Sequence, residues 1–154
     1  MTSLSCKVLE ALEGKTLATA ESCTGGMIGA ALTAVPGSSA VYKGGVISYT
    51  NQVKHELLDV SSTLLEETGA VSRGVAEAMA MGARKNLNAD VAVSVTGLAG
   101  PGGDDYGNPV GTVFIGYADA KRTFSKHFCF SGDRDQVRSQ AAEAALRMIL
   151  EYQK

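Results

Sequence analysis

The sequence lacks tryptophan and has few residues of several kinds that mark particular protein classes. Its 154 residues include three prolines, three cysteines and two histidines. Cys6, Cys23 and Cys129 are odd in number and have no CxxC spacing, which argues against both a disulfide framework and a zinc site. His55 and His127 are isolated and share no ligand spacing with acidic residues. We therefore expect neither disulfide bonds nor a bound metal ion.

Charge and long apolar runs are also scarce. Lys and Arg together number 14 and Asp and Glu 16, so the formal net charge is −2. A chain with so little net charge has no general attraction to nucleic acid or to an anionic membrane. No apolar run approaches the ~20 residues that span a bilayer. The first fifteen residues carry charges inside their apolar pattern rather than a signal-peptide core. We expect a cytoplasmic protein that binds neither nucleic acid nor membrane.

Glycine, in contrast, is abundant. The eighteen glycines cluster in pairs at 25–26 and 44–45 and within 97–107, each beside a probable strand. Glycine serves where the backbone turns with positive φ or approaches a ligand closely, so these clusters favour a site built largely from main chain. Hydrophobic residues make up 45% of the chain and charged residues 19%. That composition and length predict one domain over residues 1–154 with a substantial core.

Apolar periodicity and chain breakers predict the order of the elements. The expected helices cover 4–12, 27–35, 52–58, 62–67, 72–88 and 133–152, and the expected strands cover 16–21, 41–49, 91–96, 112–118 and 123–130. Asn51, Ser61 or Ser62, and Ser72 are the expected helix caps, and Asp133 with Gln136 forms a capping box. Strands alternating with helices, followed by a hairpin, predict an α/β sandwich with a mixed sheet flanked by helices.

The stretch 37–54 contains the parts of a Ser/Lys hydrolase. Ser38 and Ser39 follow a Pro-Gly turn, and Lys54 lies at the start of a predicted helix. A serine nucleophile needs a base, and a lysine amine becomes a base near neutral pH only when its pKa is lowered. Burial and the partial positive charge of a helix N-terminus both lower it. The ordinary alternative is that the serines cap a turn and the lysine is solvated.

Two strand-to-loop junctions could bind a ligand through backbone N–H groups. The segment 21–26 (ESCTGG) lies between a strand and a helix, and 96–103 (TGLAGPGG) follows another strand. Neither is a Walker A or a GxGxxG motif, so neither predicts a P-loop or a Rossmann site. Simple helix capping and a mobile surface loop are the respective alternatives. Cys23 has no adjacent histidine and is interpreted as a packing residue.

Arg134 and Arg138 stand four residues apart on the first turns of the last helix. Their guanidinium groups could clamp a phosphate in bidentate fashion. The alternative is that both lie on a solvated helix face.

Four motifs together resemble a known family. AESCTGG, VPGSSAVYKGGVISYTNQVK, TGLAGPGG followed by PVGTVFIGY, and GDRDQVR occur in the order and rough spacing of the CinA carboxy-terminal domain family. That family comprises stand-alone nicotinamide-nucleotide amidases and the matching domain of competence/damage-inducible CinA proteins. The resemblance extends from Leu4 to about Leu150. The loop 104–108 departs from the acidic-and-lysine sequence common in the family.

The resemblance implies hydrolysis of the carboxamide of nicotinamide mononucleotide to nicotinate mononucleotide and ammonia, without a metal or cofactor. Ser39 matches the nucleophile, Lys54 the base and Tyr49 the active-site tyrosine. The remaining matches imply substrate-binding groups at Ser22, Thr24, Gly25, Gly26, Thr96, Gly97 and Arg138, the last chosen over Arg134. The expected partner is a small nucleotide substrate. By resemblance alone, we also expect a homodimer or higher homo-oligomer.

Two other functions stay open on the sequence. One is a non-catalytic nucleotide-binding or competence-linked interaction domain with the same fold. The other is an amidase for a different small amide. Ammonia release from nicotinamide mononucleotide separates the first alternative from the amidase, and a panel of amides separates the second.

Overall fold

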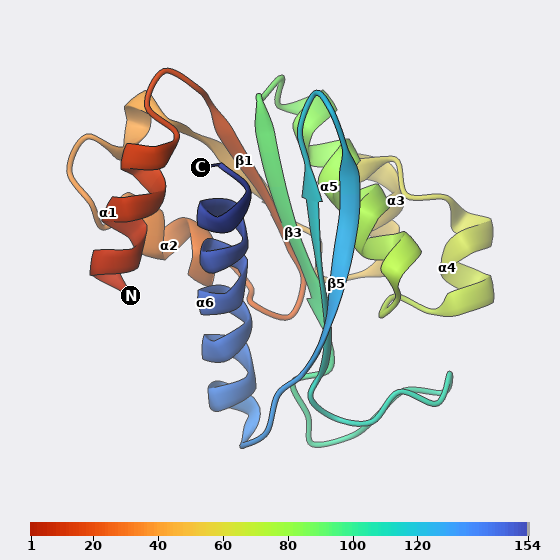
Figure 1. Ribbon diagram of the computed structural model, residues 1–154. Coiled ribbons are helices and arrows are strands. Elements are labelled where there is room, and N and C mark those ends of the chain that lie inside the picture. Colours follow the sequence, from red (N-terminus) through yellow and green to blue (C-terminus); the bar gives the residue numbers. More distant parts are fainter. Residues whose placement is uncertain (154) are drawn as a thin grey trace.

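A five-stranded mixed sheet lies between two layers of helices in the computed structural model, which describes residues 1–153 (Figure 1). The strand order is β2-β1-β3-β4-β5, with β1, β2 and β3 parallel and β4 and β5 antiparallel. The strands are β1 (Leu17–Glu21), β2 (Tyr42–Ile47), β3 (Val91–Gly97), β4 (Thr112–Ala118) and β5 (Thr123–Cys129). The predicted fold class, an α/β sandwich with a mixed sheet, is confirmed.

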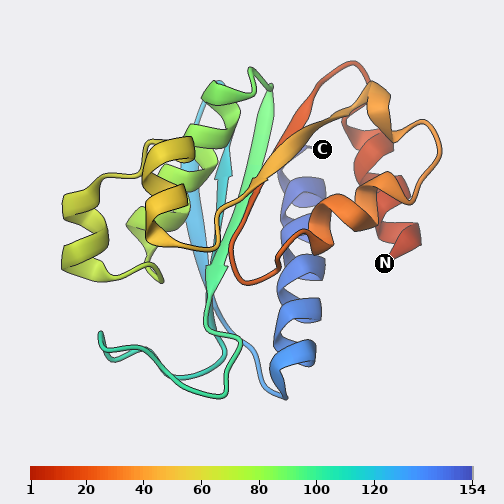
Figure 2. The same ribbon diagram turned by 180° about the vertical axis from the view of Figure 1, so that it is seen from behind.

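The helices divide between the two faces of the sheet (Figures 1 and 2). One face is covered by α1 (Thr2–Ala11), α2 (Met27–Thr33) and α6 (Arg134–Tyr152). The other face carries α3 (Asn51–Leu58), α4 (Ser62–Thr68) and α5 (Arg73–Asn86). A short 3₁₀ helix, η1 (Ser38–Ala40), precedes β2. The crossover from β1 to β2 and that from β2 to β3 therefore run over opposite faces.

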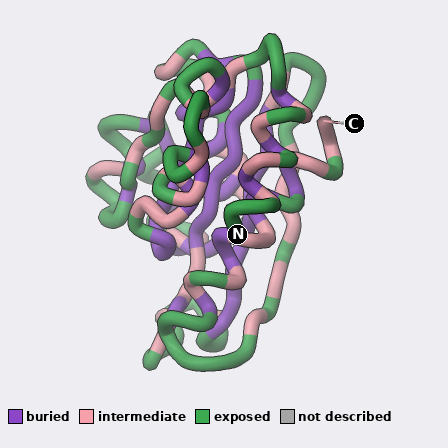
Figure 3. Tube along the Cα trace, turned by 90° about the vertical axis from the view of Figure 1, so that its left-hand side faces the viewer, coloured by how far each residue is buried: buried purple, intermediate pink, exposed green. Residues whose placement is uncertain are grey.

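Burial of the central strands on both faces explains their sequences. All residues of β1 and β4, and all of β3 except its last, are buried, as the continuous purple stretches of Figure 3 show. Large side chains such as Leu17 and Val93 belong to the core under α1 and α6. Their neighbours Ala18 and Ala92 belong to the core under α5. Small residues on that face allow α5 to lie close to the sheet.

Gly116 in β4 marks the closest approach of α5. A Cβ at this position would collide with the backbone carbonyl oxygen of Ala76 in α5 and with the hydroxyl of Ser94. The Ser94 hydroxyl itself donates to that carbonyl across the same contact. The glycine is thus required by packing rather than by a turn.

The carboxyl ends of β1, β2 and β3 meet at one edge of the sheet, which we call the carboxyl edge. The loop between β3 and β4 and the first turn of α6 lie at this edge, at the bottom of Figure 1. Open α/β sheets bind ligands outside the carboxyl ends of their strands, where the strand order reverses. Here the order reverses at β1, which has β2 on one side and β3 on the other.

Most of the expected helix starts are confirmed. The side chains of Ser61 and Ser72 cap α4 and α5, and Asp133 with Gln136 forms the predicted capping box of α6. The cap of α3 is Thr50 rather than Asn51, because the Thr50 hydroxyl accepts the N–H of Val53. The second helix ends at Thr33 and the second strand at Ile47, both earlier than expected.

We expect Gly116→Ala to lower the free energy of unfolding by about 1–3 kcal/mol, because the new methyl group forces α5 away from β4. Urea denaturation measures the change. Gly102→Ala is the matched control, since a Cβ at Gly102 would meet nothing within 4 Å. Equal stabilities of the two variants would contradict the close-packing account.

Candidate active site

The side chain of Lys54 is buried at the carboxyl edge. It lies in the first turns of α3 and is 1% exposed. Its Nζ lies 2.7 Å from the carbonyl oxygen of Ser48 and 3.0 Å from the hydroxyl oxygen of Ser22. Burial lowers the pKa of this amine to about 8, because the interior disfavours the ammonium form. A lysine with a lowered pKa beside a hydroxyl group has the arrangement of a base and its nucleophile.

Strand pairing places the two partners of Lys54. Ser22 follows the last residue of β1, and its N–H donates to the carbonyl of Val95 in β3. Ser48 follows β2, and its N–H donates to the carbonyl of Glu21 at 2.8 Å. Both contacts extend the parallel ladder past the ends of the strands. The hydroxyl and the carbonyl therefore stand on adjacent strands, with the amine of Lys54 between them.

Ser39, the nucleophile expected from the resemblance, does not meet Lys54 within one chain. It is exposed in η1, before β2 begins, whereas Lys54 follows the end of β2. The six residues of β2 span roughly 20 Å, so η1 and α3, which lie beyond its two ends, are separated by the length of the strand (Figure 2). Within one chain, the hydroxyl beside the Lys54 amine is that of Ser22. The role of Ser39 as nucleophile stays a prediction.

The turn after Ser22 is organised around the buried carboxylate of Glu21. Its Oε1 accepts the hydroxyl of Thr24 at 2.7 Å and the N–H groups of Gly26 and Ile28, and its Oε2 accepts the N–H of Gly29. The free N–H groups at the start of α2, which the sequence suggested for a ligand, are thus bound by the protein's own carboxylate. Direct substrate binding by Thr24 and Gly26 stays a prediction, and the structure gives both groups protein partners.

Gly25 and Arg138 meet on the other side of this turn. Gly25 has a φ of 58° and is exposed. The Arg138 guanidinium donates from Nε to the carbonyl of Cys23 at 2.9 Å and from Nη2 to the carbonyl of Thr24 at 3.4 Å. Arg138 therefore lies in the site, as expected, but its donors are directed at main chain.

A second arginine bridges the rim of the site. Arg134 donates from Nη1 to the carbonyl of Gly100 and from Nη2 to the hydroxyl of Tyr49 at 3.1 Å. Tyr49 directly follows Ser48, and its side chain is 59% exposed. These contacts join the segment after β2, the β3–β4 loop and the start of α6. Tyr49, an expected catalytic residue, lies at the rim rather than against the Lys54 amine.

Thr96 and Gly97 have internal roles at the end of β3. The hydroxyl of Thr96 donates to the carbonyl of Ala70 at 2.7 Å, and the side chain is 1% exposed. Gly97 packs against Val113 and Thr112, where a Cβ would not fit. Their assignment to substrate binding stays a prediction.

Cys23 lies next to Ser22 and is buried. Burial raises the pKa of its thiol to about 11, although the positive charges of Arg138 and Lys54 act in the opposite direction. A thiol with so high a pKa has almost no thiolate at neutral pH and is a poor nucleophile. Its interpretation as a packing residue agrees with this environment.

Sequence reasoning missed two groups of the site. The carboxylate of Glu21 carried a signal, because an acidic residue before a glycine-rich helix start can accept several N–H groups. The carbonyl of Ser48 carried none, because a backbone acceptor leaves no mark in the sequence.

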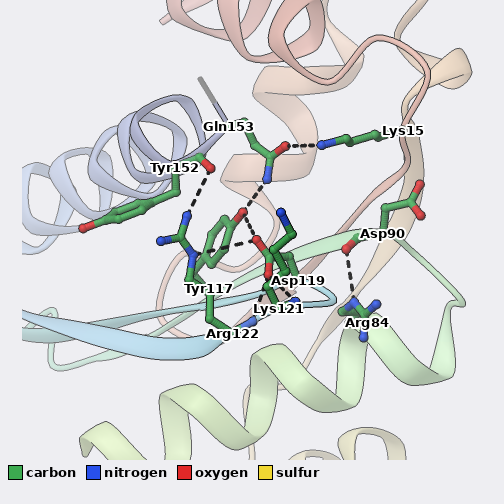
Figure 4. Close-up of polar contacts among 9 residues, drawn as sticks. All are labelled: Lys15, Arg84, Asp90, Tyr117, Asp119, Lys121, Arg122, Tyr152 and Gln153. Carbon is green, nitrogen blue, oxygen red and sulfur yellow. Dashed lines mark hydrogen bonds and ion pairs between the residues drawn. The ribbon is translucent and has the colours of Figure 1, made fainter.

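A separate polar cluster ties the opposite edge of the sheet together (Figure 4). Asp119, in the turn between β4 and β5, accepts the hydroxyl of Tyr117 at 2.8 Å and the N–H of Arg122 at 3.0 Å. The Arg122 guanidinium lies 4.8 Å from the ring centroid of Tyr152, and Gln153 donates to Tyr117. A cavity of about 380 Å³ adjoins these residues. The contacts fix the end of α6 to the hairpin.

Residues 1–153 lack two features that mark other classes of protein. Within this range, His, Cys, Asp and Glu side chains form no group of three or more that could hold a metal ion. The same residues include no helix with the length and apolar character needed to cross a membrane.

Comparison with known proteins agrees with this architecture. The sequence profile of the CinA C-terminal domain matches residues 1–153. The chain belongs to the CinA C-terminal domain family. The competence damage-inducible protein A (ComA) of Klebsiella pneumoniae superposes with a TM-score of 0.95 at 37% identity, over 97% of this chain and 94% of that one. The competence/damage inducible protein CihA of Agrobacterium tumefaciens superposes with a TM-score of 0.95 at 36% identity, over 99% of this chain and 95% of that one.

Longer relatives contain this CinA domain as one part. A CinA-like protein of Desulfotalea psychrophila is 49% identical over 139 residues, which are 90% of this chain and 34% of the relative. A CinA-like protein of a Synechococcus strain is 48% identical over 151 residues, which are 96% of this chain and 36% of the relative. The chain thus spans about a third of the length of the curated relatives that it matches.

The buried amine of Lys54 should make stability depend on pH in a defined window. The pKa of this amine is about 8 in the folded protein and 10.5 when the side chain is not buried, as in the unfolded chain. Between pH 8 and pH 10.5 the unfolded chain therefore binds more protons than the folded protein. The free energy of unfolding of the wild type, relative to Lys54→Met, should therefore rise from pH 8 to pH 10 by up to about 1.4 kcal/mol per pH unit. Chemical denaturation at each pH measures it.

The exposed Lys7→Met variant is the control for the loss of a positive charge. If the difference in unfolding free energy between the wild type and Lys54→Met does not change between pH 8 and pH 10, the amine is not desolvated.

Proposed function

We propose that this CinA domain is an amidohydrolase in which Ser22 is the nucleophile and Lys54 the general base. The observation that carries the proposal is the 3.0 Å approach of the Lys54 Nζ to the Ser22 hydroxyl, with the amine buried and its pKa lowered to about 8. A neutral amine has two N–H groups and one lone pair. One N–H is held by the Ser48 carbonyl, which leaves the lone pair to accept the Ser22 proton.

The reaction follows from this pair. Lys54 takes the hydroxyl proton as Ser22 Oγ forms a bond to the carboxamide carbon, and the carbonyl electron pair moves onto oxygen. When the tetrahedral intermediate collapses, the carbon–nitrogen bond breaks and the Lys54 ammonium gives its proton to the departing amide nitrogen, which leaves as ammonia. Water then attacks the acyl-enzyme with Lys54 again as base, which releases the carboxylic acid and restores Ser22.

Nicotinamide mononucleotide is the substrate that we propose, because the four motifs resemble those of nicotinamide-nucleotide amidases. Two features of the carboxyl edge support a substrate with an anionic group. Arg134 is exposed at the rim, and within residues 1–153 no carboxylate lies within ion-pair distance of it. We assign the substrate phosphate to Arg134 rather than Arg138, because Arg138 is half-buried and already has the carboxylate of Asp135 as an ion-pair partner.

Ser22→Ala should abolish ammonia release from nicotinamide mononucleotide, because no other hydroxyl lies at hydrogen-bonding distance from the Lys54 amine in residues 1–153. Ser39→Ala is the matched control and should keep substantial activity as an isolated chain, since Ser39 lies beyond the far end of β2. Coupled ammonia assays on both variants, with far-UV circular dichroism to verify folding, make the comparison.

The reverse result, an inactive Ser39→Ala and an active Ser22→Ala, would overturn the assignment and would require Ser39 of a second copy in the site. A wild type that binds the nucleotide without releasing ammonia would support a non-catalytic binding domain instead.

The rate of turnover should rise with pH through about 8, because only the neutral amine of Lys54 accepts a proton and about a tenth of it is neutral at pH 7. Lys54→Arg should lose nearly all turnover, since a guanidinium stays protonated in this range. Steady-state rates between pH 6 and 9.5 give the profile. A rate independent of pH, or near-normal turnover in Lys54→Arg, would show that another group is the base.

A further inference from the structure

Arg138 holds the main chain directly after the proposed nucleophile. Its side chain reaches from α6 to the carbonyl oxygens of Cys23 at 2.9 Å and Thr24 at 3.4 Å. Its other contact is a long ion pair with Asp135, 3.8 Å apart, in which the Asp135 side chain is 91% exposed. Exposed ion pairs contribute little free energy. The main-chain carbonyls are therefore the principal partners of this guanidinium.

A hydrogen bond that fixes the carbonyl of a peptide group also fixes the direction of the N–H in the same peptide group. In a trans peptide the C=O and the N–H point in opposite directions. The Ser22 carbonyl is held by the N–H of Gly25 at 3.1 Å, which orients the N–H of Cys23. The Cys23 carbonyl is held by Arg138, which orients the N–H of Thr24.

Neither of these two N–H groups, of Cys23 and of Thr24, donates to another residue within the described part of the chain; the N–H of Cys23 faces only its own thiol. Buried backbone donors are almost always paired, so two consecutive unpaired N–H groups beside a nucleophile are unusual. Glu21 holds the same turn from the other side through Thr24 and Gly26. The turn is thus braced on both flanks while these two donors stay free.

We propose that Arg138 is a positioning residue that orients the N–H groups of Cys23 and Thr24 as the oxyanion hole for the reaction of Ser22. The inference rests on the proposed amidohydrolase function. When Ser22 Oγ adds to the carboxamide carbon, negative charge develops on the carbonyl oxygen, and fixed N–H donors stabilise it. Arg138 transfers no proton and makes no bond to the substrate. This role replaces the phosphate contact that the sequence suggested for Arg138.

The test compares Arg138→Ala and Arg138→Lys with the wild type, and Arg147→Ala is the control on an exposed part of the same helix. We expect kcat for nicotinamide mononucleotide to fall about tenfold to a hundredfold in Arg138→Ala, since displaced donors lose transition-state stabilisation. The kcat of Arg138→Lys should lie between those of the wild type and Arg138→Ala, because an ammonium group can hold one of the two carbonyls. KM and the calorimetric affinity for nicotinate mononucleotide should change less than about threefold.

The opposite pattern would overturn the inference: a kcat near the wild-type value together with an affinity for nicotinate mononucleotide reduced tenfold or more. That result would make Arg138 a phosphate ligand and would leave the amidase function intact. The midpoint of the pH–rate profile should stay near 8 in Arg138→Ala, because the variant does not touch Lys54. A shifted midpoint would show that Arg138 acts through the base and not through the N–H groups.

Amide hydrogen exchange tests the positioning without turnover. In Arg138→Ala, exchange of the Gly25 amide, which is bonded to the Ser22 carbonyl, should accelerate several-fold, while that of Leu146 in the middle of α6 stays unchanged. Unchanged Gly25 exchange would contradict the positioning role. If the wild type releases no ammonia, the proposed function fails, and this measurement still decides whether Arg138 holds the turn.

Discussion

The arrangement of the carboxyl edge, and the chemistry that we propose for it, depend on the placement of one buried amine. Lys54 lies between the Ser22 hydroxyl and the Ser48 carbonyl, at the ends of two adjacent parallel strands. Burying an amine costs free energy, and the protein lowers that cost by letting the amine lose its proton near pH 8. The same desolvation that lowers stability makes the amine a base. The rest of the carboxyl edge holds the two strand ends and the turn in register around it.

The turn between β1 and α2 shows how a short glycine-rich segment becomes rigid. The Glu21 carboxylate gathers four donors from one side, and the Arg138 guanidinium gathers two carbonyls from the other. Gly25 and Gly26, with φ of 58° and 111°, supply the backbone conformation that permits both sets of contacts. Glu21 and Arg138, which are 117 residues apart in the sequence, thus hold opposite sides of one turn. Ser22 lies at the start of this turn.

Most of the fold and part of the candidate site could be predicted from the sequence. The side chains that meet across strands could not, for physical reasons that can be named. Apolar runs and capping residues gave the strands β1, β3, β4 and β5 closely, because burial and local hydrogen bonds are encoded locally. The lowered pKa of Lys54 was expected from its place in the chain. Ser39 and Lys54 do not meet within one chain, because β2 separates them by the length of a strand, and the role of Ser39 stays a prediction. Ser22 reaches Lys54 only through the parallel β1–β2 register.

The most direct test of the central claim is the reaction of the folded domain with a fluorophosphonate, which modifies activated serine hydroxyls irreversibly. Peptide mass spectrometry locates the adduct, and the modification rate is followed from pH 6 to 9.5. The account predicts an adduct on Ser22 whose rate of formation rises with pH through a midpoint near 8, the pKa of Lys54. An adduct on Ser39, or a rate on Ser22 that does not change with pH, would contradict it.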